Sequence, residues 1–344
     1  MKRLSVCFEA PYQVAVRDEP LPPLEPSQVL VETLASAISS GTELLVYRGQ
    51  VPTEITVDET IPSLTGKFDY PLKYGYAAVG RVIEVGSEVS PEWQGRCVFA
   101  YNPHESHFIS SPKELIPLPS ILSPEEGTLL SNMETAVNFL MDGGPLVGEQ
   151  VAVFGQGTVG LLTTSLLTQF PLASLVTLDP IPLRREKSLS VGAHHALDTT
   201  VPDALSRLHE ALQQGRPYKG ADLVYELSGN PAALDLAIAA TGFNGRVVIG
   251  SWYGQKKIPL DLGGRFHRSR ISLISSQVST ISPGLQSRWN KTRRWQLAFE
   301  MLQRLRPVHL VTHRFFVDEA AQAYSLLDRS PEQTIQILLT YGGK

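Results

Sequence analysis

The stretch Val151-Ala-Val-Phe-Gly-Gln-Gly-Thr-Val-Gly160 decides the fold of this chain. It contains most of an apolar run, Gln150–Phe154, which predicts a strand, and it leads directly into a helical pattern over Leu161–Gln169. The glycines between them have G-x-G-x-x-G spacing and are Gly155, Gly157 and Gly160. A strand, a glycine-rich turn and a helix in this order predict the first unit of a dinucleotide-binding (Rossmann) sheet.

Each glycine of this turn has a separate physical task. Gly155 permits the tight turn, Gly157 lets a pyrophosphate approach the backbone, and Gly160 lets the helix pack close to the strand. Thr158 and Val159 stand at the start of the helix, where unpaired backbone N–H groups and the positive end of the dipole favour phosphate. These five residues are therefore candidate cofactor-binding residues.

A carboxylate follows the second predicted strand. The run Leu175–Leu178 ends at Asp179, close to the position about 20 residues beyond the glycines where an acidic residue binds the adenosine ribose. Such a carboxylate accepts hydrogen bonds from the ribose hydroxyls and repels a 2′-phosphate, which favours NAD(H) over NADP(H). Arg184 and Arg185 follow soon after, and their positive charge would weaken that preference.

The second half of the chain alternates apolar runs with helical segments. This rhythm begins at Ser123-Pro-Glu-Glu126, a helix start with serine at the N-cap and proline in the first turn. Such alternation predicts a mostly parallel sheet covered by helices. Ser228, in a loop that follows one strand, is a further candidate for cofactor contact, with ordinary turn chemistry as the alternative. The predicted strands are Gln150–Phe154, Leu175–Leu178, Leu223–Glu226, Arg246–Ile249 and Ile271–Ser275.

The N-terminal part of the chain has a different pattern. Gln28–Glu32 and Gly80–Val85 alternate apolar and polar side chains, with Pro and Gly clusters between them, so this part is predicted to be β-rich. At the other end of the chain, a helix is expected over about Trp289–Leu305 and a closing strand at Thr334–Leu339.

Composition excludes several classes of protein. Of the 344 residues, 42% are hydrophobic and 19% are charged, which is enough apolar material for about two globular domains. The net charge of −4 gives no basic face for nucleic acid or an anionic membrane. Cys7 and Cys97 form neither a disulfide framework nor a four-thiolate zinc site. No signal peptide or membrane span is recognised. With only these two cysteines, a reducing, cytoplasmic setting is expected.

Several motifs, taken together and in this order, resemble the medium-chain dehydrogenase/reductase superfamily. They are Ser40–Glu43, Gly75–Gly80, Thr135-Ala136, the glycine-rich turn, Gly220–Asn230 and Gly245–Gly250. The resemblance implies an α/β fold, with a doubly wound Rossmann sheet and a β-rich, GroES-like catalytic domain. It divides the chain into 1–122 (catalytic), 123–287 (Rossmann) and 288–344 (a segment returning to the catalytic domain). It also implies an NAD(P)(H)-dependent dehydrogenase or reductase, cofactor contact at Thr135, and a homodimer joined through an edge strand at Ile271–Ser275.

The departures from the superfamily pattern concern zinc. Ser40 stands in the place of a ligand Cys, Tyr76-Ala77 stands in the place of a His-Glu pair, and the third ligand position falls near Ser131 or Asn132. None of these residues is a strong zinc ligand, so no zinc is expected. The signatures at Ile38–Glu43 and Tyr70–Gly80 resemble a zinc-free branch, the bacteriochlorophyllide dehydrogenases.

Without a metal, a hydrogen-bond donor must polarise the substrate oxygen. Thr42 matches the superfamily position that begins the proton relay. Tyr76 is a phenol that either donates a proton or fills the space left by zinc. His104, in His104-Glu-Ser-His107, either transfers a proton or is a surface histidine ahead of a strand. Glu43 is expected to brace its loop.

The sequence thus favours interconversion of an alcohol and a carbonyl by hydride transfer to or from NAD(H). The alternatives are an enone or quinone reductase and a non-catalytic dinucleotide-binding protein. The partner is a small molecule, and carboxylates on it would suit a basic rim, unless these cations form a solvated surface. The cations are Arg265, His267, Arg268, Arg270, Arg288, Lys291, Arg293 and Arg294.

Overall fold

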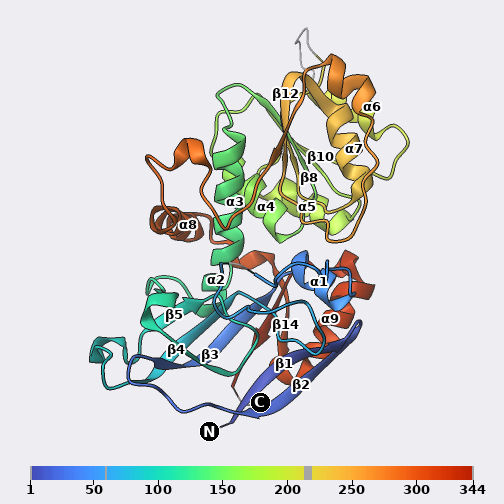
Figure 1. Ribbon diagram of the computed structural model, residues 1–344. Helices are drawn as coiled ribbons and strands as arrows, with labels where there is room; N and C mark the ends of the chain where they lie inside the picture. Colours follow the sequence, from blue (N-terminus) through green and yellow to red (C-terminus); the bar gives the residue numbers. More distant parts are fainter. Residues whose placement is uncertain (1, 59, 213–218, 343–344) are drawn as a thin grey trace. The chain divides into compact units, whose positions relative to one another are not determined.

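The computed structural model describes residues 2–58, 60–212 and 219–342 (Figure 1). The chain divides into two compact units, of which the first combines Met1–Ser131 with Leu302–Lys344 and the second is Asn132–Met301. The C-terminal segment therefore folds with the N-terminal part of the chain. The domain boundaries expected from the sequence, after 122 and after 287, remain a prediction.

A parallel sheet forms the centre of the second unit. Within the described residues it has six strands in the order β10-β9-β8-β11-β12-β13. All neighbouring strands are parallel, and the chain changes direction across the sheet between β8 and β11. This order is that of a doubly wound Rossmann sheet, so the predicted fold class is confirmed. The strands are β8 (Gln150–Phe154), β9 (Ser174–Leu178), β10 (His195–Leu197), β11 (Ala221–Glu226), β12 (Thr241–Ile249) and β13 (Ser272–Ser275).

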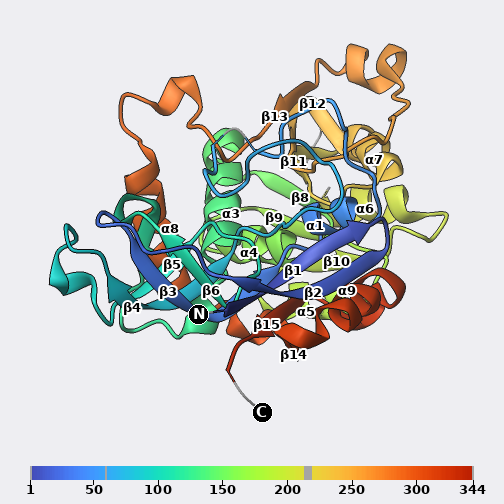
Figure 2. The ribbon, with the colours of Figure 1, turned by 60° about the horizontal axis from the view of Figure 1, so that its bottom comes forward.

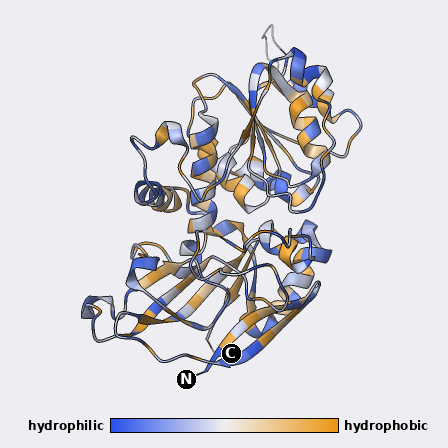
Figure 3. Ribbon diagram, viewed as in Figure 1, coloured by the Kyte–Doolittle hydropathy of each residue, from blue (hydrophilic) through white to orange (hydrophobic). Residues whose placement is uncertain are grey.

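Burial on both faces explains why these runs form parallel strands. Every residue of β8 and β9 is buried, as is typical of a parallel sheet covered by helices. Figure 3 shows helices with both hydrophobic and hydrophilic stretches, as expected of helices with one face on a core. β10 was not predicted, because it has three residues and all are only half-buried. The helices are α3 (Leu130–Gly143), α4 (Thr158–Leu167), α5 (Pro182–Ser190), α6 (Ala204–Leu212), α7 (Pro231–Ala240) and α8 (Lys291–Leu305).

A mostly antiparallel sheet of seven strands forms the first unit, counted over the described residues. The chain's last strand, β15, pairs antiparallel with β3, and β14 lies parallel beside β15 (Figures 1 and 2). The predicted strands at Gln28–Glu32 and Gly80–Val85 lie largely in β3 and β4. The strands are β3 (Val29–Ile38), β4 (Ala78–Val85), β5 (Cys97–Ala100), β6 (His107–Ser110), β7 (Leu115–Pro117), β14 (Val311–Phe316) and β15 (Gln336–Thr340). A separate hairpin, β1 (Lys2–Ala10) and β2 (Gln13–Pro20), was not foreseen.

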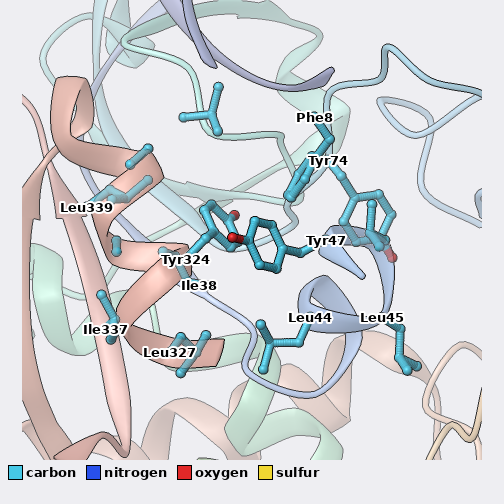
Figure 4. Close-up of a cluster of buried hydrophobic side chains, with 14 of the residues drawn as sticks. Phe8, Ile38, Leu44, Leu45, Tyr47, Tyr74, Tyr324, Leu327, Ile337 and Leu339 are labelled. Carbon is cyan, nitrogen blue, oxygen red and sulfur yellow. The ribbon is translucent and has the colours of Figure 1, made fainter. Parts of the chain in front are cut away.

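Aromatic and aliphatic side chains together form a core of the first unit (Figure 4). Tyr324, from α9 (Ala320–Arg329), stacks on Tyr47, from α1 (Thr42–Tyr47), with ring centroids 5.7 Å apart. Phe8 meets the same Tyr324 ring edge-on at 5.1 Å. These contacts fix the short helix α1, which bears residues of the candidate site, against the C-terminal segment.

None of the helices in the described part of the chain combines the length and the apolar character needed to cross a bilayer.

Candidate active site and dinucleotide site

The glycine-rich turn has a geometry that only glycine permits at two positions. Gly155 has φ +87°, and a Cβ there would stand 2.6 Å from the backbone of Ser228. A Cβ at Gly160 would stand 1.9 Å from the carbonyl oxygen of Gly155. Helix α4 therefore starts in direct contact with the end of β8, as the sequence predicted.

Gly157 is the N-cap of α4, and its backbone is open to a ligand. Apart from the adjoining residues of the chain, no atom lies within 4 Å of the position that a Cβ would take, and no side chain caps the helix. Thr158 is buried and Val159 packs against the core, so both can offer only backbone N–H groups to a phosphate. An uncapped helix start beside open space fits the pyrophosphate of a dinucleotide.

Asp179 lies at the end of β9 and is only 3% exposed. Its Oδ2 accepts a hydrogen bond from the backbone N–H of Gln156, at 2.7 Å, and its Oδ1 accepts one from that of Ile181, at 2.9 Å. The carboxylate therefore anchors the glycine-rich turn. Each oxygen keeps a second lone pair that a ribose hydroxyl can use.

The two arginines after Asp179 differ in their surroundings. Burial lowers the pKa of Arg184, in α5, and the nearby charge of Asp179 acts in the opposite direction. Arg185 donates to the backbone carbonyl of Asp179 and forms an ion pair with Asp198 at 3.1 Å. Arg184 thus lies near enough to Asp179 for the two charges to interact.

A buried carboxylate that the sequence reasoning missed holds the loop after β11. Glu226 accepts hydrogen bonds from the backbone N–H of Ser228, at 2.8 Å, and from the hydroxyls of Ser228 and Tyr253. This loop is the one that meets Gly155. Ser228 therefore lies beside the glycine-rich turn, whereas Thr135 lies half-buried in α3.

A cluster of three hydroxyl groups lies in the first unit. The Tyr76 hydroxyl donates to Ser39 Oγ at 2.5 Å and is also hydrogen-bonded to Thr42. Burial raises the pKa of Tyr76, an effect that these two bonds oppose and that the charge of Glu43 reinforces. The structure thus brings together the predicted Thr42 and Tyr76, and it adds Ser39, which the sequence reasoning missed. We call Ser39, Thr42 and Tyr76 the hydroxyl cluster.

His104 is completely buried, so its interpretation as a surface histidine is wrong. Its Nε2 lies 2.9 Å from Oε2 of Glu43, which is also completely buried. Its Nδ1 lies 2.6 Å from Ser36 Oγ. Since an ionised carboxylate only accepts, Nε2 donates to Glu43, and in the neutral ring Nδ1 then accepts from Ser36.

Two tyrosines of the C-terminal segment extend this buried chain of groups. The Tyr341 hydroxyl lies 2.7 Å from Ser36 Oγ, and the Tyr324 hydroxyl donates to Glu43 Oε2. Burial raises the pKa of both phenols. A serine, a histidine and an acid in a row suggest a nucleophilic triad, but Ser36 has no exposed surface, so no substrate reaches it.

The residues at the positions where the resemblance places zinc ligands do not fit zinc. Ser40 and Tyr76 offer hydroxyls, which are poor ligands for this ion. Both ring nitrogens of His104 are already engaged. Across the described ranges, no three His, Cys, Asp or Glu side chains are grouped so that they would hold a metal ion.

Two of the basic residues do not lie on a rim. Arg294 is completely buried and pairs with Glu134 at 2.8 Å. Arg265 donates to the backbone carbonyls of Thr241 and Lys219. These two arginines are therefore wrong as candidates for substrate carboxylates, because their guanidinium groups hold the fold together.

The second unit matches a known family model. A model described as "zinc-binding dehydrogenase" matches residues 158–298. This range does not include Ser40, Tyr76, Ser131 or Asn132, so the match says nothing about the residues at the zinc positions.

Curated relatives and solved structures agree with the fold. The chain is 28% identical over 248 residues to an uncharacterized zinc-type alcohol dehydrogenase-like protein of Escherichia coli, a match covering 70% of this chain and 65% of that protein. It is 25% identical to a sorbitol dehydrogenase of Bacillus subtilis, over 73% and 75% of the two chains. The crystal structure of 2R,3R-butanediol dehydrogenase from Bacillus subtilis superposes with a TM-score of 0.80 at 19% identity, over 99% of this chain and 100% of that one. The chain is thus similar to zinc-type alcohol dehydrogenase-like proteins, and its named relatives are dehydrogenases.

Proposed function

We propose that the protein interconverts a secondary alcohol and a ketone with NAD(H) and without catalytic zinc. The observation that carries this proposal is the hydroxyl cluster. A partly buried phenol, Tyr76, stands where the resemblance places a zinc ligand and is hydrogen-bonded to Ser39 and Thr42. Zinc would polarise a substrate oxygen as a Lewis acid, and a fixed hydrogen-bond donor serves the same purpose.

The two units supply different parts of the reaction. The turn at Gly155–Gly160 binds the pyrophosphate, and a bound nicotinamide supplies the hydride chemistry. Because burial raises the pKa of Tyr76, its phenol stays protonated at neutral pH and can donate to a carbonyl oxygen. Ser39 and Thr42 orient that phenol and can exchange its proton.

The names of several relatives support a secondary alcohol as substrate. They include a butanediol dehydrogenase, a D-guloside 3-dehydrogenase and an L-threonine 3-dehydrogenase. In 2,3-butanediol, in the sugar ring and in threonine, the hydroxyl concerned is on a secondary carbon. Oxidation of 2,3-butanediol and sorbitol with NAD⁺ is therefore the first assay. Tight NADH binding without turnover of either would favour the non-catalytic alternative.

Zinc content tests the metal-free site. Protein purified without chelators is expected to contain well below one zinc per chain, because the hydroxyl cluster offers no thiolate or imidazole. Turnover should also be unchanged after incubation with 1,10-phenanthroline. Metal analysis by mass spectrometry and the NAD⁺ assay measure the two quantities. One full equivalent of zinc, with activity lost on its removal, would refute this active site.

The preference for NAD(H) is proposed to depend on Asp179. Replacing Asp179 with Asn keeps one oxygen for the backbone of the turn and removes the charge that repels a 2′-phosphate. The ratio of NADPH to NADH affinity should rise by about tenfold or more, since like charges in contact are strongly unfavourable. Fluorescence titration with each nucleotide measures the ratio.

Asp222→Asn is the matched control for this variant. Asp222 also accepts a hydrogen bond from a backbone N–H, that of Gln150, at 2.8 Å. It is the second residue of β11 and therefore lies at the amino end of that strand. An unchanged affinity ratio in Asp179→Asn would mean that the ribose contact is wrongly assigned.

A further inference from the structure

The imidazole of His104 contacts both segments that carry the hydroxyl cluster. On one side it lies 2.9 Å from Glu43, which belongs to the turn that begins at Ser39. On the other side it lies against Gly75, where an added Cβ would stand 2.8 Å from the ring atoms Cδ2 and Nε2. Gly75 directly precedes Tyr76. The ring therefore lies between the segment that bears Tyr76 and the turn that bears Ser39, and it sets the distance between them.

Glu43 transmits this contact to Ser39. Its Oε1 accepts a hydrogen bond from the Ser39 backbone N–H at 2.8 Å, and its own N–H donates to the Ser39 carbonyl at 3.0 Å. Its Oε2 accepts from His104 and Tyr324. A buried carboxylate is stable only while donors surround it, so its orientation follows those donors. Losing the imidazole would let the carboxylate rotate and loosen the turn.

The loop that carries His104 is held from its other side as well. The neighbouring Glu105 forms ion pairs with Lys73, at 2.7 Å, and Arg3, at 3.2 Å. The carbonyl of His104 accepts a hydrogen bond from the Val6 N–H at 2.9 Å. With Ser36 on Nδ1, the ring has no freedom to turn, as expected of a group that positions its neighbours.

We propose that His104 is a positioning residue that sets the hydrogen bond between Tyr76 and Ser39 by holding Glu43 and Gly75 in place. The inference rests on the proposed function, since it concerns the same hydroxyl cluster. His104 does not touch the substrate, because it has no exposed surface. We therefore propose that His104 positions the hydroxyl cluster, in place of the direct proton transfer expected from the sequence.

The hydrogen bond of Tyr76 can be observed without any substrate. The chain contains 11 tyrosines, which can be labelled with 3-fluorotyrosine, and the ¹⁹F resonance of Tyr76 is the one that Tyr76→Phe removes. In His104→Ala this resonance should shift or broaden. Imidazole added at about 10 mM, a concentration suited to weak binding, should restore the resonance by refilling the cavity. His107→Gln is the matched control, because His107 lies in the same segment and its Nδ1 lies 3.1 Å from the hydroxyl of the adjacent Ser106, outside the hydroxyl cluster.

Turnover of 2,3-butanediol is the second readout. His104→Ala should lower kcat by about 100-fold, the cost of slightly misplacing a reacting group, while NADH affinity stays unchanged. His104→Gln keeps one donor and should show a smaller loss, with the Tyr76 resonance displaced in the same direction. If His104→Ala does not fold, His104→Gln carries the test.

The two readouts keep this inference separable from the proposed function. If the wild-type protein oxidises no alcohol, the proposed function fails, and the ¹⁹F resonance still decides the role of His104. An unchanged Tyr76 resonance in a folded His104 variant overturns the inference, even if the enzyme is active. A resonance that responds equally to His107→Gln overturns it too, since the effect would then not be specific to the buried ring.

Discussion

Replacing Gly157 with Asp is expected to weaken NADH binding by about 100-fold or more while the fold stays intact, because a carboxylate would face the pyrophosphate. Gly157 is extended, with φ −71° and ψ −172°, and nothing lies within 4 Å of the added Cβ. Asp is also a favourable N-cap, so the variant should unfold at the same or a higher temperature. NADH fluorescence and thermal denaturation, run on one sample, separate the two effects.

The control for this variant is Gly284→Asp. It places the same charge in the same unit, at another glycine with open space around it and without a positive φ. NADH should bind this control as it binds the wild-type protein. Wild-type affinity in Gly157→Asp would show that the phosphates lie elsewhere, and the dinucleotide site would have to be reassigned.

The parts of the fold that the sequence predicts are those encoded by neighbouring residues. The strand at Gln150–Phe154 has the bounds expected for it, because four apolar residues in a row end at a glycine that must turn. The helix start at Ser123 is confirmed by a capping box with Glu126. Such signals depend on a few consecutive side chains and hold wherever the segment lies in the fold.

The parts that the sequence does not predict come from contacts between distant residues. Tyr324 reaches Glu43 across 281 positions and Tyr341 reaches Ser36 across 305, because β15 pairs with β3. No local pattern marks a tyrosine that will contact a carboxylate so far away in the chain.

Arg294 shows the opposite error, in which a local pattern misleads. It stands among other cations in a polar stretch, which is typical of an exposed helix face. Glu134, 160 positions earlier, pairs with it in the interior. A buried guanidinium is stable only with such a partner, and the partner is visible only in the folded chain.

Replacing Tyr76 with Phe is expected to lower kcat for 2,3-butanediol by about 100-fold or more, the usual contribution of a positioned proton donor, with NADH affinity unchanged. In this variant the rate of ketone reduction should also no longer fall at alkaline pH. Only the protonated phenol donates, and burial raises the pKa of Tyr76 above its ordinary value of 10.0. In the wild-type protein the rate should therefore stay level through neutral pH and fall only as the pH rises past 10, whereas in the variant this fall should be absent.

Tyr74→Phe is the matched control, because Tyr74 lies in the same core with its ring centroid 6.1 Å from that of Tyr76. It removes a buried phenol but leaves all three hydroxyls of the cluster and the Tyr74 ring in place, so kcat and its pH profile should stay as in the wild-type protein. The comparison of the two variants decides between the two interpretations of Tyr76. If Tyr76→Phe turns over as fast as Tyr74→Phe, Tyr76 only fills space, and Thr42 or Ser39 must polarise the substrate oxygen. If only Tyr76→Phe is slow, the phenol polarises the substrate oxygen, because a fixed hydrogen-bond donor stabilises a developing oxyanion without a metal.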